Sequence, residues 1–244
     1  MSAWASAMMN PNDPNVALVE VVARYLGDAL REQLVFVGGA VAGLLITDPA
    51  MPAIRSTDDV DLVVHVTVLK DYHAVERALT ARGFVQDMSR DAPICRWRAG
   101  AVAVDVMPTI ETVLGFSNRW YPLATESPQH VVLPSGIEIR LISAPAFIAT
   151  KLEAFAGRGN SDYLFSHDLG DLIAVIDGRE SLLQECRSSD KELRQYLRDR
   201  FSGLLAARGF VEALPGHLPG DMASQSRLPD LANKLRALAQ LDQL

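Results

Sequence analysis

The segment DVDLVVHV at residues 59–66 constrains the fold of this chain more than any other. Its polar and apolar residues alternate, which is the pattern of a β-strand buried on one face. Asp59 and Asp61 therefore lie together on one face. Two carboxylates so close to each other repel unless a cation lies between them. The strand thus predicts a site for a hard divalent cation with oxygen ligands, Mg²⁺ above all. The opposite, apolar face carries Val60, Leu62, Val64 and Val66.

A second apolar strand carries a third acid. Residues 101–107 alternate in the same way, and Asp105 shares its face with alanines that leave room around it. Aspartate is depleted in strands, and Asp105 has no polar neighbour along its own strand face. We therefore expect three strand carboxylates to converge on a pair of metal ions. The alternative is that Asp59 and Asp61 face solvent and that Asp105 is a turn acid with satisfied hydrogen bonds.

A glycine pair lies upstream of these acids. Leu34–Val37 has the pattern of a short strand, and Gly38 and Gly39 separate it from a helical segment at residues 40–46. A turn without side chains lets backbone N–H groups and a helix N-terminus approach an anion. The turn therefore predicts a phosphate site, although many turns of this kind use glycine for conformation alone.

The remaining pattern divides the chain at residue 143. Up to that point helices, strands and hairpins are mixed, and beyond it helical spacing prevails. We therefore expect an α/β (α+β) protein with a mixed-sheet domain over 1–143 and a helical domain over 144–244. The segment 209–227, rich in proline and glycine, is expected to be a loop or linker. The predicted helices are 13–32, 70–82, 146–156, 168–176, 190–208 and 229–241, and the predicted hairpins are 94–107 and 130–142.

Charge limits the partners of this chain. Its 244 residues carry a net charge of −7, which argues against a non-specific binder of polyanions. Residues 187–208 nevertheless contain six basic and three acidic residues. That run is either a solvated helix face or a groove for an acceptor RNA.

Cysteine content and hydropathy indicate the compartment. Cys95 and Cys186 are too few for a disulfide framework, and we expect both to be reduced thiols. The N-terminus lacks the basic and apolar regions of a secretory signal. The most apolar stretch, residues 34–46, is well short of the ~20 residues that span a bilayer. We expect a cytoplasmic protein with no membrane partner.

Together these motifs resemble the nucleotidyltransferase superfamily of the DNA polymerase β type. Val37-Gly38-Gly39, Asp59-Val60-Asp61 and Val104-Asp105-Val106 match its hG[G/S], DxD and third strand acid. Further along, KLEAF at 151–155, Arg158 and SHDLGDL at 166–172 resemble the AbiEii-type toxins of bacterial toxin–antitoxin and abortive-infection systems. A serine often follows the first glycine in the wider superfamily. Here Gly39 stands in that position, so backbone amides or another side chain must hold the phosphate.

The resemblance implies a two-metal nucleotidyl transfer. Asp59, Asp61 and Asp105 would hold two Mg²⁺ ions that bind the triphosphate of an NTP and activate an acceptor hydroxyl. A toxin of this kind would act on an acceptor such as a tRNA 3′ end and would have a cognate antitoxin. Lys151 is expected to be free to reach the triphosphate, whereas Asp168 is either a cleft residue or a charge that stabilises a helix start. The nucleotide-binding residues implied are Gly38, Gly39, Thr57, Lys151, Arg158, Asp168 and Asp171.

Two other functions stay open from the sequence. A small-molecule nucleotidyltransferase of the antibiotic-modifying kind shares the strand acids but needs an acidic pocket for a cationic drug. A catalytically silent module that binds a nucleotide or a partner would not need the acids. The presence of Asp59, Asp61 and Asp105 speaks against the silent module.

Overall fold

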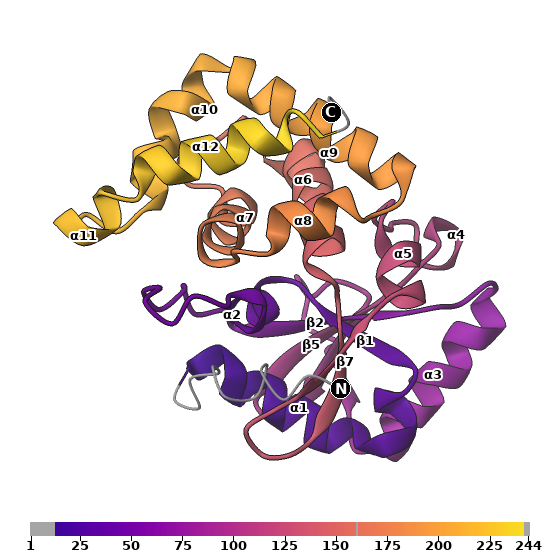
Figure 1. Ribbon diagram of the computed structural model, residues 1–244. Helices are drawn as coiled ribbons and strands as arrows, with labels where there is room; N and C mark the ends of the chain where they lie inside the picture. Colours follow the sequence, from indigo (N-terminus) through magenta and orange to yellow (C-terminus); the bar gives the residue numbers. More distant parts are fainter. Residues whose placement is uncertain (1–12, 160, 242–244) are drawn as a thin grey trace. The chain divides into compact units, whose positions relative to one another are not determined.

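The computed structural model describes residues 13–159 and 161–241 (Figure 1). The chain divides into two compact units, which we call the sheet unit and the helical unit. The sheet unit takes in the chain up to Leu44 together with Arg55–Ser143, and the helical unit takes in Leu45–Ile54 together with the chain from Ala144 onward. A mixed sheet followed by helices confirms the α/β class predicted from the sequence.

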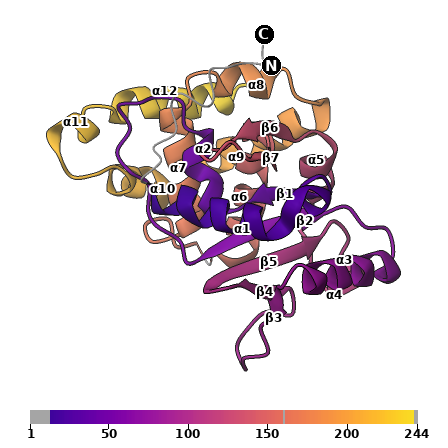
Figure 2. The same ribbon diagram turned by 90° about the horizontal axis from the view of Figure 1, so that it is seen from below.

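The sheet unit is built on a seven-stranded mixed sheet in the order β3-β4-β5-β2-β1-β7-β6. The pairing of the central strands determines where the strand acids lie. Strand β2 pairs antiparallel with β1 and parallel with β5, and β4 pairs antiparallel with β5. Figure 2 shows β1, β2, β5, β4 and β3 following one another in that order. The strands are β1 Leu34–Val37, β2 Asp59–Val64, β3 Val85–Gln86, β4 Arg96–Ala99, β5 Val102–Pro108, β6 Gln129–Val132 and β7 Glu138–Leu141.

Helix α1 (Pro14–Arg31) packs on this sheet, and it begins where the sequence predicts. The Asp13 carboxylate accepts a 2.8 Å hydrogen bond from the Asn15 backbone N–H, and Pro14 occupies the first turn. Apolar residues at helical spacing, from Val16 to Leu30, fill the core beneath the helix. The other helical segments here are η1 Gly39–Val41, α2 Ala42–Leu45, α3 Leu69–Ala81, α4 Glu111–Leu114 and α5 Tyr121–Glu126.

In the helical unit, α6 packs against α7 and α9, and α12 packs against α7, α8 and α9. The segment Leu45–Ile54 joins this unit because the backbone N–H groups of Thr47 and Asp48 both donate to the Gly178 carbonyl at 2.9 Å. The helices are α6 Ala144–Arg158, α7 His167–Gly178, α8 Leu182–Arg187, α9 Lys191–Ala206, α10 Arg208–Ala213, η2 Leu214–His217, α11 Met222–Gln225 and α12 Leu228–Leu238.

One segment differs from the prediction. Residues 209–227, expected as a loop or linker, contain most of α10 together with η2 and α11. Proline and glycine keep these helical turns short, but buried Phe210 and Leu214 hold them against the helical unit. Burial of apolar side chains therefore prevails over the local turn signals here. Among the described residues, no helix combines the length and hydropathy needed to cross a membrane.

Candidate active site

The three strand acids lie on one face of the sheet. Asp61 is in register with Asp105 across the parallel pair β2 and β5, and Asp59 is in register with Ala103. Residues opposite each other on paired strands present their side chains to the same face. Asp105 is buried at 8% exposure, whereas Asp59 and Asp61 are half-buried. The three acids thus share one face of the sheet, as strand alternation predicts.

Gly38 lies directly against this cluster. It ends β1 with φ +74°, a backbone conformation that L side chains rarely adopt. A Cβ atom added at Gly38 would collide with Oδ2 of Asp61. The next residue, Gly39, is buried and begins η1. Glycine at position 38 is thus required twice, by its φ angle and by the approach of the Asp61 carboxylate.

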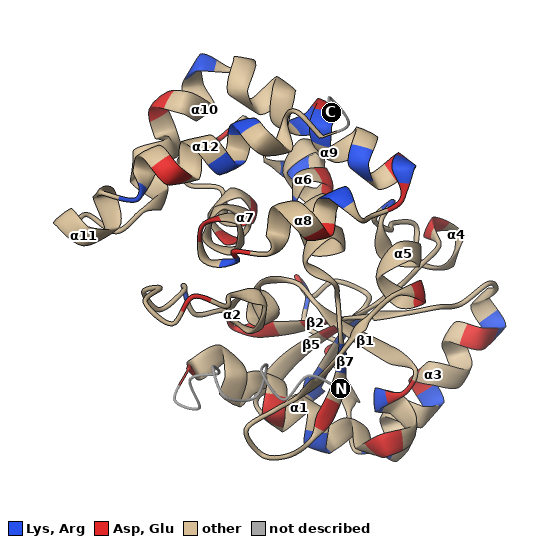
Figure 3. Ribbon diagram, viewed as in Figure 1, with Lys and Arg blue, Asp and Glu red and all other residues tan. Residues whose placement is uncertain are grey.

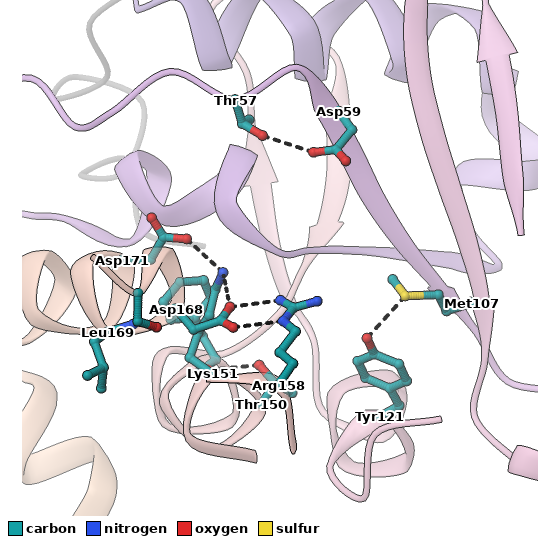
Figure 4. Close-up of polar contacts among 12 residues, drawn as sticks. Thr57, Asp59, Met107, Tyr121, Thr150, Lys151, Arg158, Asp168, Leu169 and Asp171 are labelled. Carbon is teal, nitrogen blue, oxygen red and sulfur yellow. Dashed lines mark hydrogen bonds and ion pairs between the residues drawn. The ribbon is translucent and has the colours of Figure 1, made fainter. Parts of the chain in front are cut away.

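A small polar network holds the chain that leads into β2. Thr57 Oγ1 donates a 2.9 Å hydrogen bond to Oδ1 of Asp59 (Figure 4). The Thr57 backbone N–H donates to Oδ1 of buried Asn15 at 3.0 Å, and Asn15 Nδ2 donates to the Arg55 carbonyl at 2.9 Å. Asn15 therefore anchors the segment that positions Asp59. The sequence analysis missed Asn15. Its position beside the buried residue Val16, at the start of the predicted helix, is the signal that could have identified it.

Arg96 on β4 completes the cluster, and the sequence analysis missed it. Its Nε and Nη2 donate to Oδ1 and Oδ2 of Asp105 at 2.8 and 2.7 Å, and Nη2 also donates to Oδ2 of Asp59 at 3.0 Å. Arg96 is in register with Asp105 across β4 and β5. The expectation that Asp105 lacks polar neighbours thus holds along its own strand but is wrong across the sheet. The hairpin register would have revealed this contact.

The buried thiol beside Arg96 takes no part in acid–base chemistry near neutral pH. Burial, followed by the negative charge of Asp105, raises the pKa of Cys95 to about 12. Burial likewise raises the pKa of Cys186 to about 12. Both cysteines are free, as expected for reduced thiols.

The donor chemistry of the cluster fits a hard divalent cation. Its donors are carboxylate oxygens from two adjacent strands, the ligand type that Mg²⁺ prefers, and two of these carboxylates contact the Arg96 guanidinium. In the part of the chain that the structure describes, no group of three or more His, Cys, Asp or Glu side chains is gathered in a metal-binding arrangement. The Arg96 guanidinium contacts both Asp59 and Asp105.

A second charged cluster lies in the helical unit (Figure 4). Lys151 Nζ on α6 lies 3.2 Å from Oδ1 of Asp168 and 2.7 Å from Oδ2 of Asp171, both on α7. Arg158 Nε and Nη2 donate to the two oxygens of Asp168, each at 2.9 Å. Lys151 is only 7% exposed. The expectation that Lys151 is free is therefore wrong, because α7 turns two acids toward it.

Asp168 occupies the helix-start position, one of the two roles considered for it. It lies in the first turn of α7, where Ser166 Oγ caps the helix by accepting a hydrogen bond from the Leu169 N–H. Burial tends to raise the pKa of Asp168, but the hydrogen bonds from Arg158 and the charge of Lys151 outweigh burial and lower it. Asp168 therefore stays ionised near neutral pH. His167 begins the helix, and His65 is exposed beyond the end of β2.

The basic run at residues 187–208 lies largely along α9, where Figure 3 shows several Lys and Arg positions. Arg198 binds neighbouring Asp199 at 2.9 Å, and Arg200 donates to the Leu152 carbonyl at 3.2 Å. The Arg194 guanidinium donates to the Ser189 carbonyl. Part of this run is thus engaged within the helical unit.

Comparison with known proteins gives one family. The sequence model of the AbiEii family, described as the nucleotidyl transferase AbiEii toxin of a type IV toxin–antitoxin system, matches residues 22–242. Two solved structures from Helicobacter pylori are similar to the chain. One is described as a candidate nucleotidyltransferase, with 14% identity over 96% of this chain and 95% of that chain and a TM-score of 0.45. The other, JHP933, has 15% identity over 92% and 88% and a TM-score of 0.42. Comparison with curated proteins gives no match.

Proposed function

Because this chain belongs to the AbiEii family of nucleotidyl transferase toxins, we propose that it transfers a nucleoside monophosphate from an NTP to an acceptor hydroxyl, using Mg²⁺ held by Asp59, Asp61 and Asp105. The enzyme class, nucleotidyltransferase, follows from the family, as does a place in a toxin–antitoxin system. The observation that carries the metal site is the cross-strand pair of Asp61 with Asp105 beside Asp59. Adjacent strand carboxylates of this kind need a cation to offset their repulsion.

The three acids take different parts in this proposal. Asp59 and Asp61 lie one residue apart on β2, at the end of the strand beside the Gly38-Gly39 turn, and would hold the metal that carries the triphosphate. Asp105, more deeply buried on β5, would hold only the metal nearest the acceptor and so would serve its deprotonation. Bound Mg²⁺ would offset the triphosphate charge and lower the pKa of the acceptor hydroxyl. The hydroxyl oxygen then attacks the α-phosphorus and pyrophosphate leaves.

Each unit, taken by itself, contains residues that we propose to contact phosphate. In the sheet unit, the backbone N–H groups of Gly38 and Gly39 would approach the phosphates, and Thr57 would orient Asp59 through its hydroxyl. In the helical unit, Arg158 is the better placed cation, since its side chain is 73% exposed while it holds Asp168. Lys151 is buried between Asp168 and Asp171, so its contribution would be to fix those acids and α7.

We further propose that the acceptor is RNA, most specifically a tRNA 3′ end, and that a cognate antitoxin opposes the enzyme. The excess of basic residues over 187–208 in a chain of net charge −7 supports an anionic acceptor. Toxin–antitoxin family membership supports the antitoxin.

The test is a transfer assay with each of the four labelled NTPs, Mg²⁺, and total tRNA or no acceptor. Label is expected on tRNA with at least one NTP, and EDTA is expected to abolish it. Asp61→Asn serves as the inactive control. Folded protein that labels no RNA with any NTP in the presence of Mg²⁺ would overturn the proposed acceptor class.

A further inference from the structure

We propose that Arg96 is a positioning residue that competes with divalent metal for Asp59 and Asp105, so that the nucleotide-free protein binds metal weakly. The proposal rests on the metal site proposed above. It concerns a residue of β4 that none of the sequence motifs includes. It rests on three hydrogen bonds, each of which joins the Arg96 guanidinium to one of the acids at 3.0 Å or less.

The first step is that Arg96 is held in place by the sheet. Its backbone N–H donates to the Pro93 carbonyl at 2.9 Å, and the next residue, Trp97, is buried at 4% exposure on the opposite face. The register with Asp105 then directs the guanidinium onto the acid face. The cation is therefore a fixed part of the cluster, unlike a flexible surface arginine.

The second step is that the carboxylate oxygens of Asp59 and Asp105 already accept hydrogen bonds. Both oxygens of Asp105 accept from the Arg96 fork, a geometry that strengthens charge-assisted hydrogen bonds. Of the two oxygens of Asp59, Oδ2 accepts from Arg96 and Oδ1 accepts from Thr57. A metal that binds these oxygens must replace or share the guanidinium contacts, and it must approach a fixed positive charge.

The third step concerns the benefit to the fold. Asp59 and Asp105 lie on adjacent strands of one face, and their like charges repel. The Arg96 guanidinium supplies the opposing charge when metal is absent. The same contact that keeps the carboxylates together therefore lowers their affinity for metal.

The chain offers a matched control in Arg98. It lies two residues further along β4 and so on the same face as Arg96, in register with Ala103. Its carboxylate partner is Asp87 at 3.0 Å, outside the acid cluster. Arg98→Gln thus removes the same charge from the same strand without removing a partner of Asp59 or Asp105.

The experiment titrates Mn²⁺ into the nucleotide-free protein and measures free Mn²⁺ by electron paramagnetic resonance. Arg96→Gln is expected to bind Mn²⁺ about tenfold or more tightly than the wild type, the effect of losing one charge-assisted contact. Arg96→Lys keeps the charge but lacks the fork, so its affinity is expected to lie between the two. Arg98→Gln is expected to match the wild type. If Arg96→Gln does not fold, judged by circular dichroism, Arg96→Lys decides the question.

Two results would overturn the inference, and they are distinguishable. If Asp61→Asn weakens Mn²⁺ binding but neither Arg96 variant strengthens it, Arg96 does not compete and the metal site stands. A merely structural role for Arg96 predicts this outcome, because disordered acids bind metal less well. If no variant binds Mn²⁺, with or without NTP, and the wild type transfers no nucleotide, the proposed metal site is wrong and the inference fails with it.

Discussion

Asp61 on β2 lies directly beside Asp105 on β5, in register across two parallel strands. The Asp61 carboxylate also lies against Gly38, the residue that follows β1. The two carboxylates are far apart in the chain, and only the sheet brings them together. Under the proposed function, this arrangement of acids serves to hold a cation. The following predictions test that interpretation.

Asp61→Asn is expected to reduce transfer by about 100-fold or more, the typical cost of removing a group that stabilises developing charge. Its side chain is half-buried in the first half of β2, and asparagine has nearly the same size as aspartate. The melting temperature is therefore expected to change little. Activity and thermal melting measured on the same sample check both statements. An equal fall in both would make Asp61 a structural residue.

Asp105→Asn separates binding from catalysis. Asparagine keeps the size of the side chain but removes its charge, so a nucleotide held through Asp59 and Asp61 is expected to bind while transfer collapses. Calorimetry with a non-hydrolysable NTP and Mg²⁺, run beside the transfer assay, measures both quantities. Binding that falls as far as transfer would instead show that Asp105 builds the nucleotide site itself.

Gly38→Ala tests the close approach of β1 to Asp61. Alanine at φ +74° and ψ −168° costs about 1–3 kcal/mol in backbone strain, and its Cβ also collides with the Asp61 carboxylate. Gly136→Ala is the matched control, since Gly136 has φ +83° and nothing within 4 Å of an added Cβ. Urea unfolding is expected to show a larger loss for Gly38→Ala than for Gly136→Ala. Equal losses would mean that Asp61 moves aside without cost.

The sequence predicts the acid cluster because strand alternation is a local property. Residues 59–66 place Asp59 and Asp61 on one face wherever the strand lies in the sheet. The Arg96 contact is predictable in principle, because a tight turn at Gly100 pairs Ala99 with Val102 and hence Arg96 with Asp105. Alternation along a single strand does not reveal this arginine, because it lies on the neighbouring strand.

The environment of Lys151 could not be predicted in this way. Helical periodicity identifies the apolar face of α6, but it does not specify which helix packs there. Only the contact between α6 and α7 brings Asp168 and Asp171 to Lys151. Burial of a lysine among acids is a tertiary property, and a single sequence carries no local signal for it.

Lys151→Ala is expected to destabilise the helical unit by about 3–5 kcal/mol, the cost of removing one partner from a buried ion-pair cluster. Asp168 and Asp171 are 5% and 3% exposed, so neither acid can turn to water without moving α7. Arg200→Ala is a suitable control, since that arginine donates to the Leu152 carbonyl on the same helix and belongs to no ion pair of this cluster. Urea unfolding of the three proteins checks the difference. A Lys151→Ala protein as stable as the control would show that solvent compensates the two acids.

The pH dependence of stability provides the last test, because the folded-state pKa of Asp168 lies below its ordinary value. A carboxylate whose pKa is lowered by folding stabilises the protein fully above its unfolded pKa, about 3.9 for aspartate. That contribution is lost as the pH falls from there through the folded pKa. The free energy of unfolding of the wild type is therefore expected to decline below about pH 4. Asp168→Asn is expected to start lower at pH 7 and to decline less steeply, since it has no proton to bind at that position. Parallel slopes for the two proteins between pH 5 and 2, measured by urea unfolding, would show that the ion pairs of Asp168 with Lys151 and Arg158 contribute nothing to stability.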